Sequence, residues 1–228
     1  MPLRAIVFDF DGVIANSEPL HFRAFADVLA RKGEQLSEKD YYTTYLGFDD
    51  VGVFATVNAD RKRGWSDREL ADMVADKALR LAQIERDMSV VFPGAAEAIA
   101  RAAAAVPIAI ASGALGPEIR RILNRAGLAS HFAAIVSAED TPLSKPAPDP
   151  YVLAVSLLRR HIGGEPLKAS ECVAIEDSRW GLQSARVAGL KTVGVMSAYD
   201  RAELEPHSDL IISSIADLNI ADLHRLVH

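Results

Sequence analysis

The chain has 228 residues, of which 50% are apolar and 25% charged, and a formal net charge of −6. This length suits one large domain or a domain with an insertion, and the composition is that of an ordinary globular protein. The acidic balance without a concentrated basic stretch argues against a nucleic-acid-binding protein. No apolar run reaches the ~20 residues of a membrane span, so we expect no membrane partner.

The single cysteine, Cys172, lies in an apolar run, which predicts a small buried side chain. Without a second cysteine it can form no disulfide within the chain, which fits a reducing compartment. The N-terminal segment is strand-like and is interrupted by Asp9 and Asp11, unlike a signal peptide. We therefore expect a cytoplasmic protein, and we expect it to be a monomer.

The first apolar segment begins at Ala5 and leads into two carboxylates, Asp9 and Asp11, followed by Gly12. Because side chains alternate along a strand, both carboxylates should project from the same face at its carboxyl end. Two like charges this close need a divalent cation, nearby donors or a shared proton to offset their repulsion. A strand that simply ends in solvated acids is the alternative at this point.

Residues 17–88 have the pattern of a helical block without a strand. Ser17 is expected to cap the first helix, which Gly33 ends. Ser66 and Glu69 have the residue types of a capping box at the start of a long helix. The further expected elements are a helix from Ser37 to about Leu46, a turn at 47–50, a helix from Val51 to Val57 and the long helix from Ser66 towards Ile84.

After this block, short apolar strands alternate with helices. The expected strands are 106–111, 134–136, 172–175, 192–195 and 210–212, and the expected helices are 95–104, 119–126, 150–158 and 182–188. This alternation predicts an α/β fold, a Rossmann-like parallel sheet with helices on both faces. Residues 1–16 and 89–228 would form the α/β core. Residues 17–88 would form an α-helical cap inserted after the first strand, where a lid would screen chemistry from water.

Polar residues also follow the second predicted strand and occupy a stiff loop. Parallel sheets bind ligands at the carboxyl ends of their strands. The Ser112 hydroxyl and the Gly113 amide could donate to a phosphate oxygen there, although Ser112 could instead cap the helix starting near Leu115. Lys145 lies in a loop that Pro146, Pro148 and Pro150 restrict. Such a loop suits a fixed cation, with a surface lysine in a turn as the alternative.

Two adjacent acids, Glu176 and Asp177, follow the fourth predicted strand. Mg²⁺ in proteins prefers a few carboxylates together with water, so this pair suits a magnesium site. The alternative is an acidic helix start, which the helix dipole favours. Each alternative is reasonable alone, but polar groups at four neighbouring places in one sheet favour a shared site.

The ordered segments Asp9-Phe10-Asp11-Gly12-Val13, Ser112, Lys145-Pro146 and Glu176-Asp177 resemble the four motifs of the haloacid dehalogenase (HAD) superfamily. The resemblance extends over the whole chain, and the helical block resembles the small cap of that family. Residues 16–21 and 145–149 further resemble the branch of β-phosphoglucomutase and sugar-phosphate phosphatases. Haloacid dehalogenases proper need no Mg²⁺ and generally lack the second aspartate, so Asp11 argues against carbon–halogen cleavage.

The resemblance implies catalytic roles for five residues. Asp9 would be the nucleophile that becomes an aspartyl-phosphate, and Asp11 would be the general acid and then the general base. Ser112 and the Gly113 amide would hold the transferring phosphoryl group. Lys145 would offset the negative charge of Asp9 and phosphate. This division of roles agrees with covalent and acid–base catalysis by carboxylates.

The resemblance also implies a magnesium cofactor. Asp9, the main-chain carbonyl of Asp11 and Asp177 would bind Mg²⁺, with Glu176 as a ligand or as a residue that holds a water molecule. A carboxylate approaches a phosphate dianion only if a metal and a lysine offset the repulsion.

In the cap, His21 resembles the mutase histidine that helps to position the acid–base aspartate, with a partly buried packing histidine as the alternative. Lys77 resembles a contact to the substrate phosphate, with a solvated helix lysine as the alternative. The mutase has an arginine shortly after the glycine that corresponds to Gly47 of this chain. Here residues 48–50 are Phe48, Asp49 and Asp50, and acids should repel a second phosphate.

The sequence therefore predicts a Mg²⁺-dependent phosphatase of the HAD type, acting on a small phosphorylated metabolite such as a sugar phosphate. One alternative is a β-phosphoglucomutase-like phosphomutase, in which a sugar hydroxyl captures the intermediate. A second is a non-catalytic protein that binds a phosphorylated ligand, but such a protein has no need of a second carboxylate at Asp11.

Overall fold

The computed structural model describes the chain apart from residues 1, 47, 88–89, 165 and 198. It divides into two compact units, an α/β unit of residues 1–16 and 91–228 and a helical unit of residues 17–90. The helical unit thus ends two residues beyond the boundary expected from the sequence. Each unit has its own hydrophobic core.

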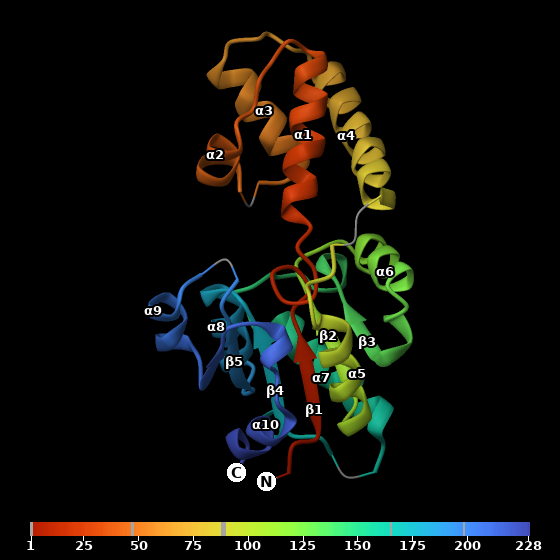
Figure 1. Cartoon of the computed structure of the whole chain (residues 1–228), viewed down its shortest axis with the longest axis vertical. Helices are drawn as coiled ribbons and strands as arrows, with labels where there is room; N and C mark the ends of the chain where they lie inside the picture. The colour runs from red at the N-terminus through yellow and green to blue at the C-terminus, as the bar shows by residue number, and fades with distance from the viewer. Residues whose placement is uncertain (1, 47, 88–89, 165, 198) are drawn as a thin grey trace. The chain divides into compact units, whose positions relative to one another are not determined.

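A six-stranded sheet forms the centre of the α/β unit, with the strand order β3-β2-β1-β4-β5-β6 (Figure 1). All five neighbouring pairs are parallel. The strands are β1 (Ala5–Phe8), β2 (Ile108–Ala111), β3 (Phe132–Val136), β4 (Cys172–Glu176), β5 (Lys191–Val195) and β6 (Leu210–Ile212). The predicted Rossmann-like parallel sheet is confirmed. Its central strands are apolar and fully buried, as expected when helices cover both faces.

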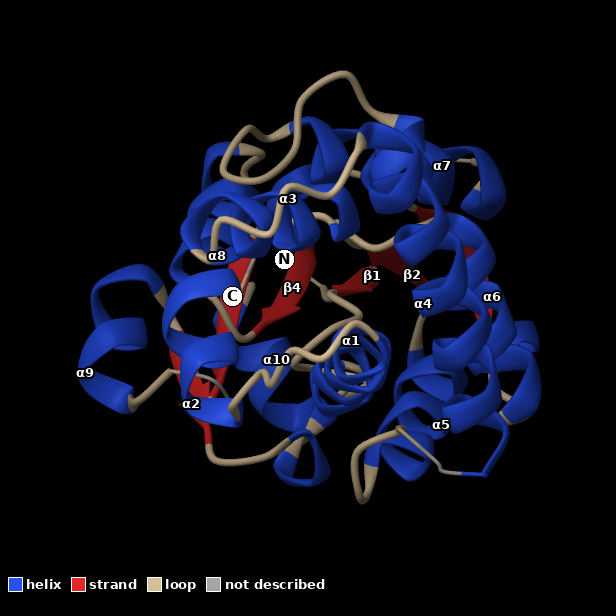
Figure 2. Ribbon diagram, turned by 90° about the horizontal axis from the view of Figure 1, so that it is seen from above, coloured by secondary structure: helices blue, strands red, loops and turns tan. Residues whose placement is uncertain are grey.

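Helices cover both faces of this sheet. They are α5 (Ala95–Ala105), α6 (Gly116–Arg125), α7 (Asp149–Ile162), α8 (Arg179–Val187), α9 (Arg201–Leu204) and α10 (Ile220–Leu226). Side chains of α7 and α8, among them Leu158 and Ala185, form one core cluster with Val7 of β1 and the buried Cys172 of β4. Helices α5 and α10 lie on the opposite face (Figures 1 and 2). The sequence pattern did not predict α9 or α10.

The connections place a topological switch point between β1 and β4. From β1 the chain builds β2 and β3 on one side, and later β4, β5 and β6 on the other. The amide of Asp9 donates to the carbonyl of Ile175 at 2.9 Å, so the segments that follow β1 and β4 start side by side. Ligands of such sheets bind at the carboxyl ends of the strands at this point.

The helical unit contains α1 (Glu18–Arg31), α2 (Glu38–Asp40), a π-helical segment (Tyr41–Tyr45), α3 (Asp50–Asp60) and α4 (Asp67–Asp87). Its core gathers Phe25, Tyr41, Phe54 and Met73, and Trp65 packs against this cluster. Between residues 17 and 90, residues 47 and 88–89 aside, no strand occurs. The predicted helical block is thus confirmed, while the first residue of the expected turn, Gly47, lies outside the described residues. Throughout the described part of the chain, every helix is too short or too polar to traverse a bilayer.

The ends of these helices agree with the sequence in two cases and differ in one. Gly33, with φ +76°, follows the end of α1, and Ser66 forms the predicted capping box with Glu69. Ser17 occupies the N-cap position of α1, but its side chain makes no capping hydrogen bond, so the expected cap is wrong. Its ψ of −22° is already helical, whereas a capping side chain needs extended backbone at this position.

Candidate active site

Four charged side chains meet where β1 and β4 end. The Nζ of Lys145 donates to Asp9 Oδ1 at 2.8 Å and to Glu176 Oε1 at 2.6 Å. Carboxylate oxygens of Asp9, Glu176 and Asp177 lie within 4.8 Å of one another. All three carboxylates are buried. The structure thus brings together residues that lie far apart in the sequence, as the hypothesis of a shared site requires.

The loop that carries Lys145 is tied to α8 by a hydrogen bond. Lys145 precedes Pro146 across a cis peptide bond, and the chain enters α7 at Asp149 after Pro148. The Ser184 hydroxyl of α8 donates to the carbonyl of Ala147 at 2.5 Å. The restricted φ angles of the prolines and this hydrogen bond limit the movement of the loop, so Lys145 extends from a rigid main chain.

The carboxylate of Asp177 is confined by Gly12 and Ser197. A Cβ on Gly12 would lie 1.9 Å from Asp177 Oδ2, and the φ of Gly12 is +76°. Both the close approach and the positive φ therefore require a glycine. The Ser197 hydroxyl donates to the same oxygen at 2.9 Å. The turn after β1 and the loop after β5 therefore determine the direction of the Asp177 carboxylate.

The electrostatics of the cluster reflect an excess of negative charge. Burial, together with the neighbouring Glu176 carboxylate, raises the pKa of Asp9 well above its usual value, against the opposing effect of Lys145. Burial and Glu176 likewise raise the pKa of Asp177 to about 7. Burial by itself would lower the pKa of Lys145, but Asp9 and Glu176 outweigh it and raise this pKa. Three carboxylates thus share one ammonium group, and their charge is not balanced by side chains alone.

This donor set fits a hard divalent cation. Mg²⁺ is bound in proteins by carboxylate, carbonyl and water oxygens, and the cluster offers carboxylate oxygens in close proximity. A divalent cation would balance the charge that Lys145 leaves uncompensated and would lower the pKa values of Asp9 and Asp177.

The other predicted core residues line the same edge of the sheet. The strand β1 ends at Phe8, so strand alternation does not place Asp11, contrary to the sequence argument. Asp11 nevertheless lies near enough to raise the pKa of Asp177. The Ser112 hydroxyl accepts from the Ala114 amide at 3.0 Å, whereas the N-cap of α6 is Leu115. The alternative that Ser112 caps this helix is wrong, because its bond closes a local turn that precedes the helix.

Gly113 follows Ser112 at an open position. It is exposed, and a Cβ built there would have no atom within 4 Å. A molecule that approaches this edge would meet the main chain directly, which is what a phosphate-binding amide requires.

Lys77 is one of two site residues predicted in the helical unit, and it is 1% exposed. The alternative of a solvated helix lysine is therefore wrong. Its Nζ donates to Asp50 Oδ1 at 2.6 Å and lies 2.9 Å from His21 Nδ1. It also lies 4.6 Å from the centre of the Phe25 ring, within the range of a cation–π contact. Helix packing buries this lysine, and Asp50 balances its charge inside the unit.

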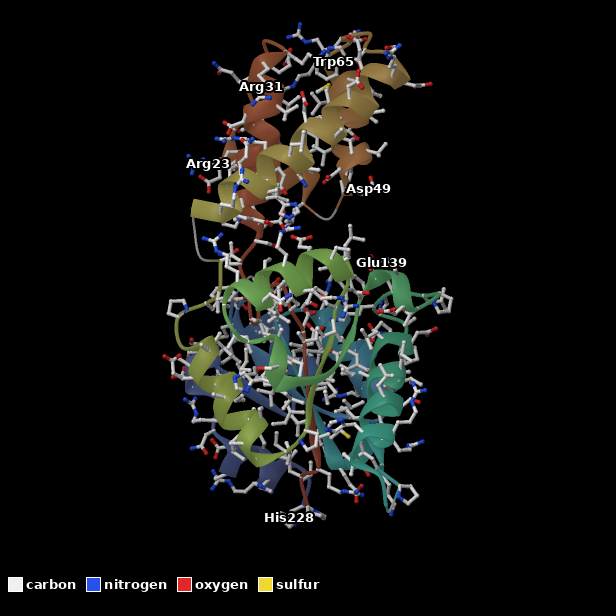
Figure 3. The ribbon with its side chains drawn as sticks, turned by 90° about the vertical axis from the view of Figure 1, so that its right-hand side faces the viewer. Arg23, Arg31, Asp49, Trp65, Glu139 and His228 are labelled. Atoms are coloured by element: carbon white, nitrogen blue, oxygen red, sulfur yellow. The ribbon has the colours of Figure 1, made fainter. Side chains whose placement is uncertain are left out.

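His21 is partly buried on α1. Because an ammonium group is only a donor, His21 Nδ1 is the acceptor in the contact with Lys77. The acids that stand in place of a mutase arginine also have local partners. Asp49, labelled in Figure 3, caps α3 by accepting from the Gly52 amide at 2.7 Å, and Asp50 pairs with Lys77.

Two further residues belong to the cluster, Tyr151 and Ser197, and neither was predicted from the sequence. The buried hydroxyl of Tyr151 donates to Glu176 Oε1 at 3.0 Å, and Ser197 donates to Asp177. Ser197 follows the end of β5, so the strand-end argument that found the other residues could have found it. Tyr151 lies in the first turn of α7, and its pattern is that of an ordinary core residue.

Comparison with known proteins places the chain in a family. The sequence profile of the haloacid dehalogenase-like hydrolases matches residues 3–189. Protein CbbY of Rhodobacter capsulatus is 33% identical over 212 residues, which cover 89% of each chain. Hexitol phosphatase B of Escherichia coli (strain K12) is 30% identical over 224 residues, which cover 96% of each chain.

A solved structure agrees with these matches. The crystal structure of CbbY from Rhodobacter sphaeroides in complex with phosphate superposes with a TM-score of 0.75 at 27% identity, over 96% of this chain and 97% of that one. The profile covers most of the chain, and both relatives match over nearly their whole length. The resemblance inferred from the four motifs is confirmed: the chain belongs to the haloacid dehalogenase-like hydrolase family.

Proposed function

We propose that this hydrolase is a Mg²⁺-dependent phosphatase that acts on a small phosphorylated metabolite of the sugar-phosphate class through an aspartyl-phosphate on Asp9. The observation that carries the proposal is the contact of Lys145 with Asp9 beside the buried carboxylates of Glu176 and Asp177. Two comparisons support the substrate class, since one relative is named a hexitol phosphatase and the CbbY structure was solved with phosphate.

In the first half-reaction, a carboxylate oxygen of Asp9 attacks the phosphorus atom, and the bond between phosphorus and the leaving oxygen breaks. Asp11 donates a proton to that oxygen, so the alcohol leaves as a neutral molecule. Lys145 reduces the repulsion between the Asp9 carboxylate and the phosphate dianion. The Ser112 hydroxyl and the Gly113 amide donate to the phosphoryl oxygens.

In the second half-reaction, a water molecule attacks the phosphorus atom of the aspartyl-phosphate. Asp11 now accepts a proton from that water, and the bond between phosphorus and the Asp9 oxygen breaks. Inorganic phosphate leaves, and the Asp9 carboxylate and the protonated Asp11 are restored.

Asp9, Asp177 and the main-chain carbonyl of Asp11 would hold the Mg²⁺ ion. When bound, the ion would neutralise negative charge on the transferring phosphoryl group. The cap residues His21 and Lys77 are assigned no direct contact with phosphate in this proposal, because Asp50 already balances the charge of Lys77.

The test is a screen for phosphate release from a panel of phosphorylated metabolites, with Mg²⁺ and with the metal chelated. We expect release to require Mg²⁺, and we expect Asp9→Asn to lower kcat by at least about 10³-fold, as the loss of a covalent nucleophile does. Circular dichroism would show that the variant is folded. Full Mg²⁺-dependent turnover by Asp9→Asn would refute the mechanism.

The same panel separates the proposed hydrolase from its alternatives. A hexose 1-phosphate that yields free phosphate supports the hydrolase, and an isomerised hexose phosphate supports a phosphomutase. Tight binding of a phosphorylated ligand without turnover of any ester would indicate the non-catalytic alternative.

A further inference from the structure

Glu176 accepts more hydrogen bonds than any other carboxylate of the cluster. Its Oε1 accepts from Lys145 at 2.6 Å and from the Tyr151 hydroxyl at 3.0 Å. Its Oε2 accepts from the Asp177 amide at 3.1 Å, the Ser178 amide at 3.2 Å and the Ser178 hydroxyl at 3.1 Å. A carboxylate offers about four lone-pair sites, so five donors leave none for a cation.

Asp9 and Asp177 differ from Glu176 in this respect. The donors to the Asp9 carboxylate are Lys145 and the Phe10 amide, both on Oδ1, and the donor to Asp177 is Ser197, on Oδ2. Within the described residues, each of these two carboxylates therefore keeps an oxygen that no hydrogen bond uses. The metal-binding capacity of the cluster is concentrated in Asp9 and Asp177.

Packing also prevents Glu176 from turning towards an ion. Its side chain is fully buried, and a Cβ on Gly181 would lie 1.6 Å from Oε1. The carboxylate is thus pressed against the main chain of α8, where only a glycine leaves room for it. The Ser178 hydroxyl that donates to Glu176 also caps α8 by accepting from the Gly181 amide at 3.1 Å.

Tyr151 contacts both Glu176 and Lys145. Its hydroxyl donates to the same Glu176 oxygen as Lys145, and the Lys145 Nζ lies 5.3 Å from the centre of its ring. The Tyr151 side chain is fully buried. Its position suits a residue that holds the side chains of Lys145 and Glu176 in contact with each other.

We propose that Glu176 positions Lys145 against Asp9 instead of binding the metal, and that Tyr151 holds Glu176 in place for this purpose. The proposal rests on the proposed function in one respect: Lys145 matters because the phosphoryl group passes to Asp9. It replaces the sequence-based expectation that Glu176 is a metal ligand or holds a metal-bound water molecule.

The first test is a crystal structure of the full chain soaked with Mn²⁺, located by its anomalous signal. We expect oxygens of Asp9 and Asp177 at coordination distance, about 2.0–2.3 Å, as hard divalent ions require. Both oxygens of Glu176 should lie more than about 3 Å from the ion and keep the bonds to Lys145 and Tyr151. A Glu176 oxygen at coordination distance, or no ion at Asp9 and Asp177, would overturn the proposal.

The second test is a double-mutant cycle of Glu176→Gln and Lys145→Ala, measured as kcat/KM. If Glu176 acts through Lys145, the double variant should be no worse than Lys145→Ala alone, although Glu176→Gln alone loses at least about tenfold. Tyr151→Phe should lose about three- to tenfold, mainly in kcat, and should add little to Glu176→Gln. Additive losses in the cycle would overturn the positioning role, since independent sites contribute separately.

Glu171→Gln is the matched control for Glu176→Gln. Glu171 immediately precedes Cys172, the first residue of β4, whereas Glu176 is its last residue. Glu171 accepts from the Lys168 amide and pairs with Arg4. It should leave kcat/KM within about twofold and show no coupling to Lys145, as expected for a distant site. If the wild-type protein released no phosphate from any ester, the proposed function would fail, whereas the Mn²⁺ structure would still decide whether Glu176 is a ligand.

Discussion

The main chain at Gly12 lies so close to Asp177 that a side chain would collide with it. In Gly12→Ala, the new Cβ would lie 1.9 Å from Asp177 Oδ2 and the residue would keep a φ of +76°. We expect kcat/KM to fall at least about tenfold, because Asp177 must turn away from its present position. The measurement is phosphate release together with Mn²⁺ affinity by calorimetry.

Gly33→Ala provides the matched control for Gly12→Ala. Gly33 has the same φ of +76°, but a Cβ there would have no neighbour within 4 Å. Both variants therefore carry the cost of positive φ, roughly 1 kcal/mol, and only Gly12→Ala adds the collision. Equal activity of the two variants would show that the approach of Gly12 to Asp177 has no catalytic consequence.

A second prediction at the level of single residues concerns Lys77. Lys77→Met removes the partner of Asp50 and the donor to His21. We expect a loss of about 1–3 kcal/mol in the free energy of unfolding, because polar groups that faced Lys77 inside the helical unit lose their hydrogen bond. Lys39→Met, at an exposed position of α2, should change it by less than about 0.5 kcal/mol. Urea denaturation measures both, and equal effects would contradict the structural role of Lys77.

Whether a residue of the site could be predicted from the sequence depends on the element that carries it. The residues after β1 and β4, Asp9 and Asp177, follow from one rule, that parallel strands end at one edge of a sheet. The same rule, applied to β5, would have included Ser197. Tyr151 and Lys77 lie on helices, and their burial depends on which side of each helix meets its neighbours. The sequence around Lys77 has charged residues on both sides, so nothing local marks it as buried.

At the scale of elements, a capping box at the start of the short 3₁₀ helix Ala138–Asp140, which follows β3, makes stability depend on pH. The Ser137 hydroxyl and amide donate to Asp140 Oδ2 at 2.6 and 2.8 Å. These bonds lower the pKa of Asp140 from 3.8, its ordinary value. A carboxyl group whose pKa is lower in the folded state stabilises the fold above the unfolded pKa, and this contribution is lost as pH falls through the folded pKa.

The measurement compares the wild type with Asp140→Asn, which keeps the side-chain shape and removes the titration. The difference in the free energy of unfolding should be constant above about pH 5 and should shrink from about pH 4 downwards. All other acids titrate in both proteins and cancel in the difference. A difference that stays constant down to pH 3, or grows, would show that the capping bonds do not favour the ionised carboxylate.

Short elements and the exact boundaries of elements were less predictable than the longer helices and the apolar strands. The strands were found because each is a short apolar run, and α10 was missed because Ile220–Leu226 is too short to show a clear period. The helix expected from Ser37 to about Leu46 is present only as α2 and a π-helical segment that ends at Tyr45. That segment contains three tyrosines and two threonines, which are poor helix formers, and tertiary burial of Tyr41 and Tyr45 decides its geometry.

At the scale of the whole molecule, the α/β unit and the helical unit each have a hydrophobic core of their own. One joins α7 and α8 to the sheet and includes Leu158, and the other surrounds Phe54 in the helical unit. The chain has two tryptophans, and each unit contains one of them, Trp180 in the α/β unit and Trp65 in the helical unit. Two independent fluorescence probes are therefore available, one for each core.

The separate cores predict that unfolding of the whole chain departs from a single transition. Phe54→Ala should cost about 3–5 kcal/mol and Leu158→Ala about 2–5 kcal/mol, as large-to-small changes at fully buried sites do. Each substitution is measured in two single-tryptophan variants: Trp180→Phe, which keeps Trp65, and Trp65→Phe, which keeps Trp180. Phe54→Ala should shift the denaturation midpoint reported by Trp65 much more than that reported by Trp180. Leu158→Ala should do the reverse. Equal shifts of both midpoints would show that the two units unfold as one cooperative block, because coincident probes are the mark of a two-state transition.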